Sequence, residues 1–97
     1  MPAVEYSARA LADLERLAEF LVAADPAHAR GTVALIMDAL DLLRLHPLVG
    51  RPVEQGLREL VISRGRTGYV ALYKYDEASD RVTVHAIRHQ REAGYAI

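Results

Sequence analysis

The spacing of apolar residues changes once along the chain, and this change limits the folds that are open to it. Before residue 47 the apolar side chains recur with a helical period of about 3.6, in two stretches separated by Asp25-Pro26. After residue 56 apolar and polar residues alternate with a period of about two, as they do in half-buried strands. The 97 residues suffice for one core, so we expect a single α+β domain over residues 1–97.

Two helices are predicted in the first half of the chain. Ser7 is a suitable N-cap for a helix over Ala8–Ala24, and Asp25 is a suitable N-cap for a second helix that starts at Pro26. The second helix should end at His46-Pro47, because a residue before proline avoids the α conformation. So short a connection makes the two helices antiparallel neighbours. The charged face of the first helix is expected to be solvated, and it carries Arg9, Asp13, Arg16 and Glu19.

The second half is predicted to form a three-stranded antiparallel meander, and a short strand at the N-terminus is expected at a sheet edge. In the last strand of the meander, Val84 and Ala86 should share one face of the sheet, with Ile87 on the other. Residues 47–56 hold two prolines and two glycines and are predicted to form a loop. The expected strands are Met1–Tyr6, Leu57–Ser63, Tyr69–Tyr75 and Arg81–His89.

Composition excludes several classes of protein. The chain has no cysteine, which excludes thiol catalysis and thiolate metal sites. It has no run of about 18 apolar residues and no signal-peptide pattern, so we expect a cytoplasmic protein without membrane contact. His85 and His89 lie four residues apart on a predicted strand, about 13 Å from each other, which is too far for a shared metal ion. We therefore predict neither a metal site nor a cofactor.

The densest group of candidate functional residues joins two segments of the second half. One is the predicted turn Arg64-Gly65-Arg66-Thr67-Gly68, and the other is Arg88-His89-Gln90-Arg91 together with Tyr95. Arginines beside a histidine and a tyrosine could hold a phosphate and move protons, as a metal-free ribonuclease requires. The same residues could bind an acidic protein surface, because arginine pairs well with carboxylates. Charges that serve solubility alone are the third interpretation.

Several short motifs follow one another in the order of the expected elements. They are Tyr6-Ser7, Pro47-Leu48-Val49-Gly50-Arg51-Pro52, Leu57-Arg58-Glu59-Leu60, Gly68-Tyr69-Val70-Ala71-Leu72-Tyr73 and Ile87-Arg88-His89-Gln90-Arg91-Glu92. In this order and spacing they resemble the RelE/ParE superfamily of toxins from bacterial type II toxin–antitoxin systems. The resemblance covers nearly the whole chain and implies a β-α-α-β-β-β toxin domain.

The resemblance implies one of two targets. RelE-like members cut mRNA on the ribosome, whereas ParE-like members inhibit DNA gyrase and lack the ribonuclease residues. RelE-like ribonucleases carry Gly-Tyr-Arg where this chain has Gly68-Tyr69-Val70, and a valine cannot neutralise a phosphate. Glu59 lies in a strand where RelE-like enzymes place lysines, and it would repel phosphate. The resemblance therefore favours a ParE-like gyrase inhibitor that acts by binding.

Two alternatives stay open beside gyrase inhibition. Arg91 and Tyr95 match the C-terminal basic residue and tyrosine of RelE-like ribonucleases, which leaves room for a ribosome-dependent mRNA endonuclease. Its catalytic residues would be Arg88, His89, Arg91 and Tyr95. The other alternative is an inactive member that is kept only as an antitoxin-binding module.

The resemblance also implies a protein partner and a role in plasmid stabilisation. The partner would be a ParD-like antitoxin of the ribbon-helix-helix type, which supplies the DNA binding. Its flexible C-terminal segment should fold on this domain as a helix and an added strand, over the apolar groove beside the helical hairpin and the basic C-terminal face. The residues predicted to contact the target or the antitoxin are Arg58, Arg64, Arg66, Arg88, His89, Arg91 and Tyr95.

Overall fold

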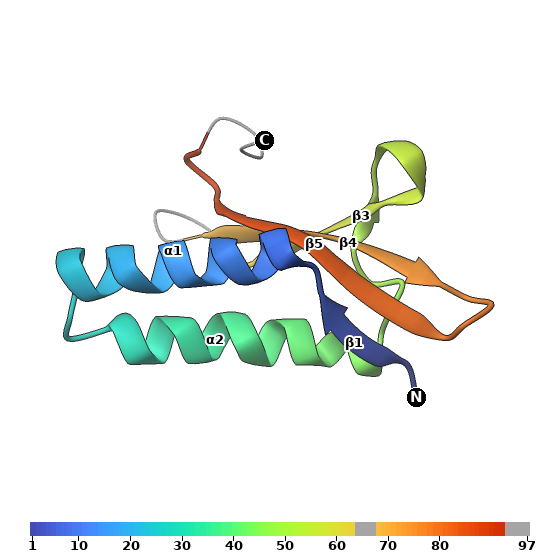
Figure 1. The fold of residues 1–97 in the computed structure, drawn as a ribbon, viewed down its shortest axis with the longest axis horizontal. Helices are drawn as coiled ribbons and strands as arrows, with labels where there is room; N and C mark the ends of the chain where they lie inside the picture. Colours follow the sequence, from blue (N-terminus) through green and yellow to red (C-terminus); the bar gives the residue numbers. More distant parts are fainter. Residues whose placement is uncertain (64–67, 93–97) are drawn as a thin grey trace.

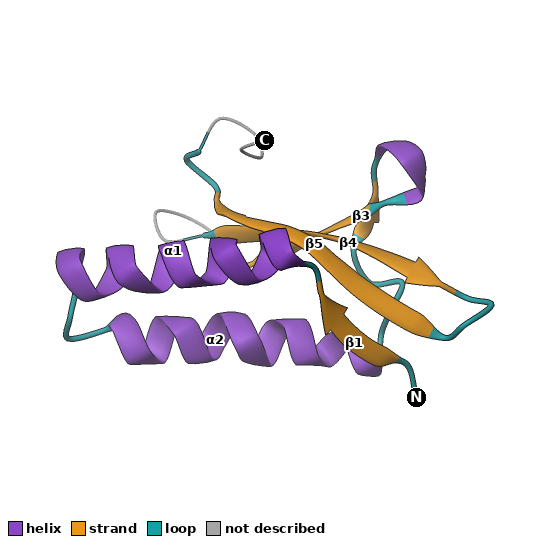
Figure 2. Cartoon of the chain, in the orientation of Figure 1, coloured by secondary structure: helices purple, strands orange, loops and turns teal. Residues whose placement is uncertain are grey.

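The computed structural model describes residues 1–63 and 68–92, and it has two layers. Two antiparallel helices lie on one side of a five-stranded sheet (Figure 1; Figure 2). No helix within the described ranges is long and apolar enough to cross a membrane. The elements are β1 (Ala3–Tyr6), α1 (Ala8–Ala24), α2 (Ala29–Asp41), the 3₁₀ turn η1 (Leu42–Arg44), β2 (Arg51–Pro52), the 3₁₀ turn η2 (Glu54–Gly56), β3 (Arg58–Ile62), β4 (Tyr69–Asp76) and β5 (Arg81–His89).

The sheet confirms the predicted meander and adds to it at both edges. Its strand order is β1-β5-β4-β3-β2, and β3, β4 and β5 pair antiparallel. The edge strand β1 pairs parallel with β5, so the sheet is mixed rather than wholly antiparallel. At the other edge, the two residues of β2 pair with β3 inside what the sequence predicted to be a loop. A strand of two residues has no hydrophobic period, and its pairing was therefore invisible in the sequence.

A β-bulge shifts the register between β4 and β5. Leu72 pairs with Ala86 and Tyr73 with Val84, which leaves His85 without a partner in β4. The strand therefore changes face at this point, as strands do at bulges. Val84 and Ile87 both join the core beneath the helices, so the prediction that they lie on opposite faces is wrong.

The first helix begins and ends where the sequence predicts, but the second does not. Ser7 caps α1 by accepting a hydrogen bond from the Ala10 N–H to its Oγ at 3.0 Å. The predicted start of the second helix at Pro26 is wrong, because residues 25–28 form a turn that reverses the chain. The His28 N–H donates to the Asp25 carbonyl oxygen at 3.1 Å, and α2 begins at Ala29. Asp25 ends α1, and its carboxylate contacts the His28 ring instead of capping α2.

The buried core lies between the sheet and the helices, with Tyr73 near its centre. The Tyr73 side chain is fully buried, and its hydroxyl oxygen accepts a hydrogen bond from the Gly50 N–H at 2.8 Å. Arg58 donates from Nη1 to the carbonyl oxygens of Leu48 and Gly50, at 3.1 Å and 2.8 Å. These contacts attach the loop before β2 to the sheet. The buried cluster comprises Ala10, Leu17, Ile36, Leu40, Leu43, Ile62, Tyr69, Ala71, Tyr73, Val82, Val84 and Ile87.

Candidate functional site

The C-terminal half of β5 extends beyond its neighbour β1, and side chains take the place of the missing strand. β1 ends at Tyr6, which pairs with Val84, so the next residues of β5 have no strand on that side. Ser7 Oγ donates to the His85 carbonyl oxygen at 3.0 Å, and Asp13 Oδ2 accepts from the buried Ile87 N–H at 2.9 Å. A buried N–H without an acceptor is costly, so α1 supplies what a sheet neighbour would have supplied.

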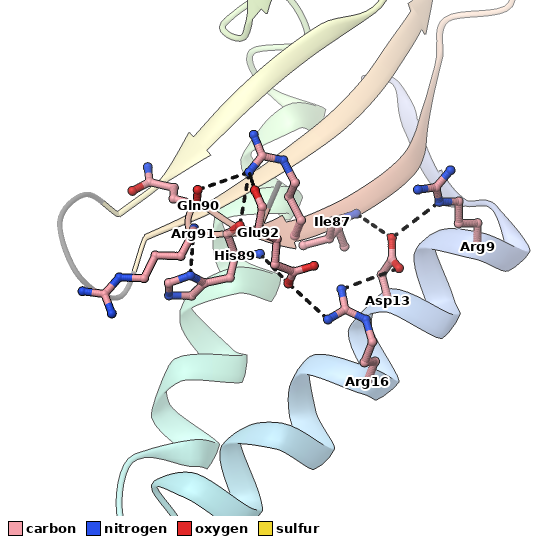
Figure 3. A network of polar contacts seen from close by, with 9 residues as sticks. Arg9, Asp13, Arg16, Ile87, His89, Gln90, Arg91 and Glu92 are labelled. Atoms are coloured by element: carbon pink, nitrogen blue, oxygen red, sulfur yellow. Dashed lines mark hydrogen bonds and ion pairs between the residues drawn. The ribbon is translucent and has the colours of Figure 1, made fainter. Parts of the chain in front are cut away.

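Asp13 is therefore part of the interior, although the sequence predicted a solvated position for it. Only 9% of the residue is exposed. Arg9 and Arg16 approach its carboxylate at 4.0 Å and 3.9 Å, one turn before and one turn after it on α1 (Figure 3). The prediction was wrong because Asp13 faces the part of β5 that extends beyond β1, where its carboxylate is needed as a hydrogen-bond acceptor.

Arg16 links Asp13 to Glu92, and these three residues form what we call the Asp13–Arg16–Glu92 network. Glu92 Oε1 accepts from Arg16 Nη1 at 3.1 Å and from the His89 N–H at 3.1 Å (Figure 3). Burial of Glu92 works against ionisation, but the two hydrogen bonds together with the positive charge of Arg16 outweigh it and lower the pKa of its carboxyl group below the ordinary value of 4.5. The network fixes the segment that follows β5 against the middle of α1.

The lowered pKa of Glu92 predicts how the network responds to acid. A depressed carboxyl pKa contributes stability above the unfolded value of about 4.5, and this contribution is lost as the pH falls through the folded value. In urea titrations we expect wild type to be more stable than Glu92→Gln at pH 6, and the difference to shrink by pH 3. A difference that stays the same at both pH values would contradict the ionised role of Glu92.

The Arg88 guanidinium points to the backbone after β5. Its Nη1 donates to the carbonyl oxygens of His89, Gln90 and Glu92, at 3.2 Å, 3.3 Å and 2.9 Å. Gln90 also donates its N–H to the Gly68 carbonyl oxygen at 2.9 Å, and its side chain lies where a Cβ on Gly68 would have to be. Arg88 thus holds the turn at the end of β5, and the missing side chain of Gly68 leaves room for the Gln90 side chain in that turn.

His89 has a defined tautomer in its neutral form. Its Nδ1 accepts a hydrogen bond from the Arg91 N–H at 3.0 Å, which places the ring proton on Nε2. The ring packs edge-to-face on Tyr69, with 5.2 Å between the ring centroids and an angle of 87°. His89 therefore presents a hydrogen-bond donor at Nε2, whereas a general base would need a free lone pair there.

A cleft of about 450 Å³ lies between α1 and the ends of β4 and β5. We call it the α1 cleft. Leu17 and Phe20 contribute from α1, and Tyr69 and His89 contribute from the sheet. The sequence predicted the β5 residues but missed those of α1, because nothing local distinguishes Phe20 from other flanking residues of an apolar stripe. The described residues that line it are Arg16, Leu17, Phe20, Tyr69, His89, Arg91 and Glu92.

The structure divides the predicted site. His89 and Arg91 line the α1 cleft, whereas Arg88 pairs with Val70 on the other face of the sheet and does not line it. Arg58 pairs with Tyr73, four residues along β4 from the Tyr69–His89 pair, or about 13 Å. Arg58 is bound to the loop carbonyls described above. Three further predicted residues, Arg64, Arg66 and Tyr95, lie outside the described ranges.

The two residues on which the target assignment depends lie away from the helices. Val70 is 4% exposed and is flanked by Val61 of β3 and Arg88 of β5. Glu59 is also buried, and Arg51 donates to its Oε1 from Nε and Nη2, at 3.2 Å and 2.7 Å. The carboxylate of Glu59 is thus held in an ion pair with Arg51.

Solved structures with the same architecture include toxins and toxin–antitoxin complexes. A chain of the chromosomal ParDE system from P. aeruginosa matches with a TM-score of 0.74, at 22% identity, over 92% of this chain and 96% of that one. A chain of the intact E. coli RelBE toxin–antitoxin complex matches with a TM-score of 0.68, at 12% identity, over 95% and 100%. The fold is therefore that of the RelE/ParE toxins.

Sequence comparison identifies the family. The model described as the ParE toxin of the type II toxin–antitoxin system parDE matches residues 4–94. The chain is also 36% identical to Toxin RelE3 of Caulobacter vibrioides over 92 residues, which are 95% of this chain and 98% of that protein. The chain belongs to the ParE toxin family of type II toxin–antitoxin systems, within the RelE/ParE superfamily.

Proposed function

We propose that this toxin inhibits DNA gyrase by binding it, performs no chemistry of its own, and is neutralised by a cognate antitoxin. The observation that carries the proposal is Val70, where the RelE-like ribonucleases have an arginine. Val70 is aliphatic and almost fully buried, so it offers a phosphate neither charge nor a hydrogen bond. Its neighbour Arg88 is turned to backbone carbonyls, which supports the same conclusion.

His89 supports a binding role as well. A ribonuclease that used this histidine as a base would need an unprotonated ring nitrogen directed at the 2′-hydroxyl. The Nδ1 lone pair is engaged by the Arg91 N–H, and Nε2 carries the proton. The exposed Arg91 and the donor at His89 suit a partner surface that carries carboxylates.

The proposal is tested with purified toxin in two assays. We expect inhibition of supercoiling by gyrase on relaxed plasmid, with cleavage complexes, and no cutting of mRNA in a translation extract. Arg91→Ala should weaken the inhibition roughly tenfold, since it removes an exposed cation from the contact surface. The control is Arg81→Ala, at the opposite end of β5, where the arginine pairs with Glu5 at 3.5 Å. Equal effects of the two substitutions would contradict the assignment of the surface.

A ribosome-dependent mRNA endonuclease is the second candidate, because the relative described above is named Toxin RelE3. In that case Arg88 or Arg91 would hold the scissile phosphate, and His89 or Tyr95 would transfer protons while the 2′-hydroxyl attacks. Cutting of mRNA at the ribosomal A site, abolished by Arg91→Ala with Tyr95→Ala, would favour this candidate over gyrase inhibition.

A groove on the far side of α2 from α1 supports an antitoxin partner. It has a volume of about 220 Å³, lies between α2, the loop before β2 and β3, and includes Leu35, Leu42 and Val49 in its lining. These three side chains are 49%, 55% and 60% exposed. Within the described part of the chain, β2 pairs with Arg58 and Glu59 of β3 and no strand pairs with the rest of that edge, which could therefore accept an added strand. A ParD-like segment that adds a helix and a strand would cover both features.

A further inference from the structure

The α1 cleft is a second concave surface, and it lies apart from the groove beside α2. Its floor is apolar and aromatic, with Leu17 buried from α1 and Tyr69 buried from β4. Phe20 stands at its side and is 65% exposed, so an apolar side chain of a partner that packs against it would remove apolar surface from water. At about 450 Å³ the cleft has the size of a pocket for a small ligand or for one large side chain of a partner.

Among the described polar groups of the cleft, one cation has no counter-ion. Arg16 and Glu92 pair with each other at 3.1 Å, so their charges offset one another. Arg91 is exposed, and within residues 1–63 and 68–92 no carboxylate pairs with its guanidinium. His89 adds the N–H donor at Nε2. Two donors and one uncompensated positive charge therefore border an apolar floor, an arrangement complementary to an apolar side chain next to a carboxylate.

Nucleic acid fits this cleft less well than peptide. Binding a phosphate backbone depends on several cations spaced along it, whereas among the described residues this cleft has one arginine without a paired carboxylate, and the carboxylate of Glu92 lies at its border. The apolar floor and the single donor pair match one anchor residue and its neighbour in a protein segment.

We propose that the α1 cleft anchors an acidic segment of the antitoxin by one aromatic or branched apolar side chain, with an adjoining carboxylate on Arg91 and His89. This inference rests on the antitoxin partnership of the proposed function. The proposed contact would cover Arg91 directly. Arg91 is the exposed cation proposed to face gyrase, so the bound antitoxin would neutralise the toxin by preventing this residue from contacting gyrase.

The test uses the whole toxin labelled with ¹⁵N and two synthetic peptides, acetyl-Glu-Leu-Phe-Glu-Glu-amide and its counterpart with lysine in place of glutamate. We expect the acidic peptide to shift the backbone amides of Leu17, Phe20, Tyr69 and His89, and the lysine peptide to leave them unchanged. Phe20→Ser and Arg91→Glu should each weaken binding of the acidic peptide roughly tenfold. Leu42→Ser, in the groove beside α2, is the matched control and should bind like wild type.

Three results would overturn the inference. They are shifts confined to the groove beside α2, equal binding of both peptides, and binding of a hexauridylate oligonucleotide that the acidic peptide cannot displace. Phe20 is largely exposed, so Phe20→Ser should keep the wild-type melting temperature, and Arg91→Glu tests the cleft independently. If the free toxin inhibits gyrase but the peptide does not bind, the cleft assignment alone fails. If the peptide binds but gyrase is unaffected, the gyrase proposal alone fails.

Discussion

Gly50→Ala is expected to destabilise the toxin by about 3 kcal/mol, at the upper end of what overpacking a rigid site costs. A Cβ on Gly50 would lie 2.6 Å from Tyr73 Cε1, 2.7 Å from the Tyr73 hydroxyl and 2.9 Å from the Glu59 carbonyl oxygen. The Tyr73 ring is fully buried and the Glu59 oxygen is backbone, so neither can move away at low cost. The Gly50 N–H would also be pushed out of its hydrogen bond to Tyr73.

Gly31→Ala is the matched control for this substitution. Nothing lies within 4 Å of the position that a Cβ would take on Gly31, which is inside α2. Alanine there should stabilise the helix by up to about 1 kcal/mol, because glycine is the weaker helix former. Urea unfolding of both variants beside wild type measures the two effects. Gly50→Ala with wild-type stability would show that the loop before β2 is not held by Tyr73 as described.

Asp13→Ala is expected to cost about 3 kcal/mol, since it leaves the buried Ile87 N–H without an acceptor and removes the carboxylate between Arg9 and Arg16. The loss of stability should be concentrated at the C-terminal end of β5. In hydrogen exchange, the amides of Ile87 and His89 should lose protection far more than those of β3, because only the former lie on the edge that α1 completes.

The conservative variant Asp13→Asn separates the hydrogen bond from the charge. Its amide oxygen can still accept from the Ile87 N–H, so most of the stability should return, with a remaining loss of about 1 kcal/mol from the two arginines. If Asn and Ala at this position were equally destabilising, the charge of Asp13 and not its acceptor would be what holds β5.

Local features of the sequence were enough to predict α1 and the meander. The helical stripe of α1 and its cap at Ser7 depend on neighbours within one turn, and the alternation in β4 depends on neighbours two residues away. The parallel pairing of β1 with β5 joins residues far apart in the chain, and no local period reports it. The bulge at His85 could not be predicted either, because one extra residue in β5 changes which residues face the core without any distinctive residue type at that position.

The candidate site was predicted in part for the same reason. His89 and Arg91 are close in sequence, so their grouping required no knowledge of the fold, whereas the alternation along β5 turns Arg88 to the other face of the sheet. The contribution of α1 did require that knowledge. In the sequence, Asp13 belongs to a charged stripe. Because β1 ends at Tyr6, the Ile87 N–H has no neighbouring strand to accept its hydrogen bond, and the Asp13 carboxylate accepts it instead. The contact role that the resemblance implies for Arg58 stays a prediction, and the structure places its guanidinium on the carbonyl oxygens of Leu48 and Gly50.

Gyrase inhibition is tested most directly by a supercoiling assay on relaxed plasmid with purified toxin added. A translating lysate is treated with the same toxin in parallel. We expect supercoiling to stop and DNA breaks to accumulate on gyrase, while messages in the lysate remain intact. Messages cut at the ribosome, with gyrase still fully active, would show that a toxin with valine at residue 70 is nevertheless a ribonuclease, and would contradict gyrase inhibition as its function.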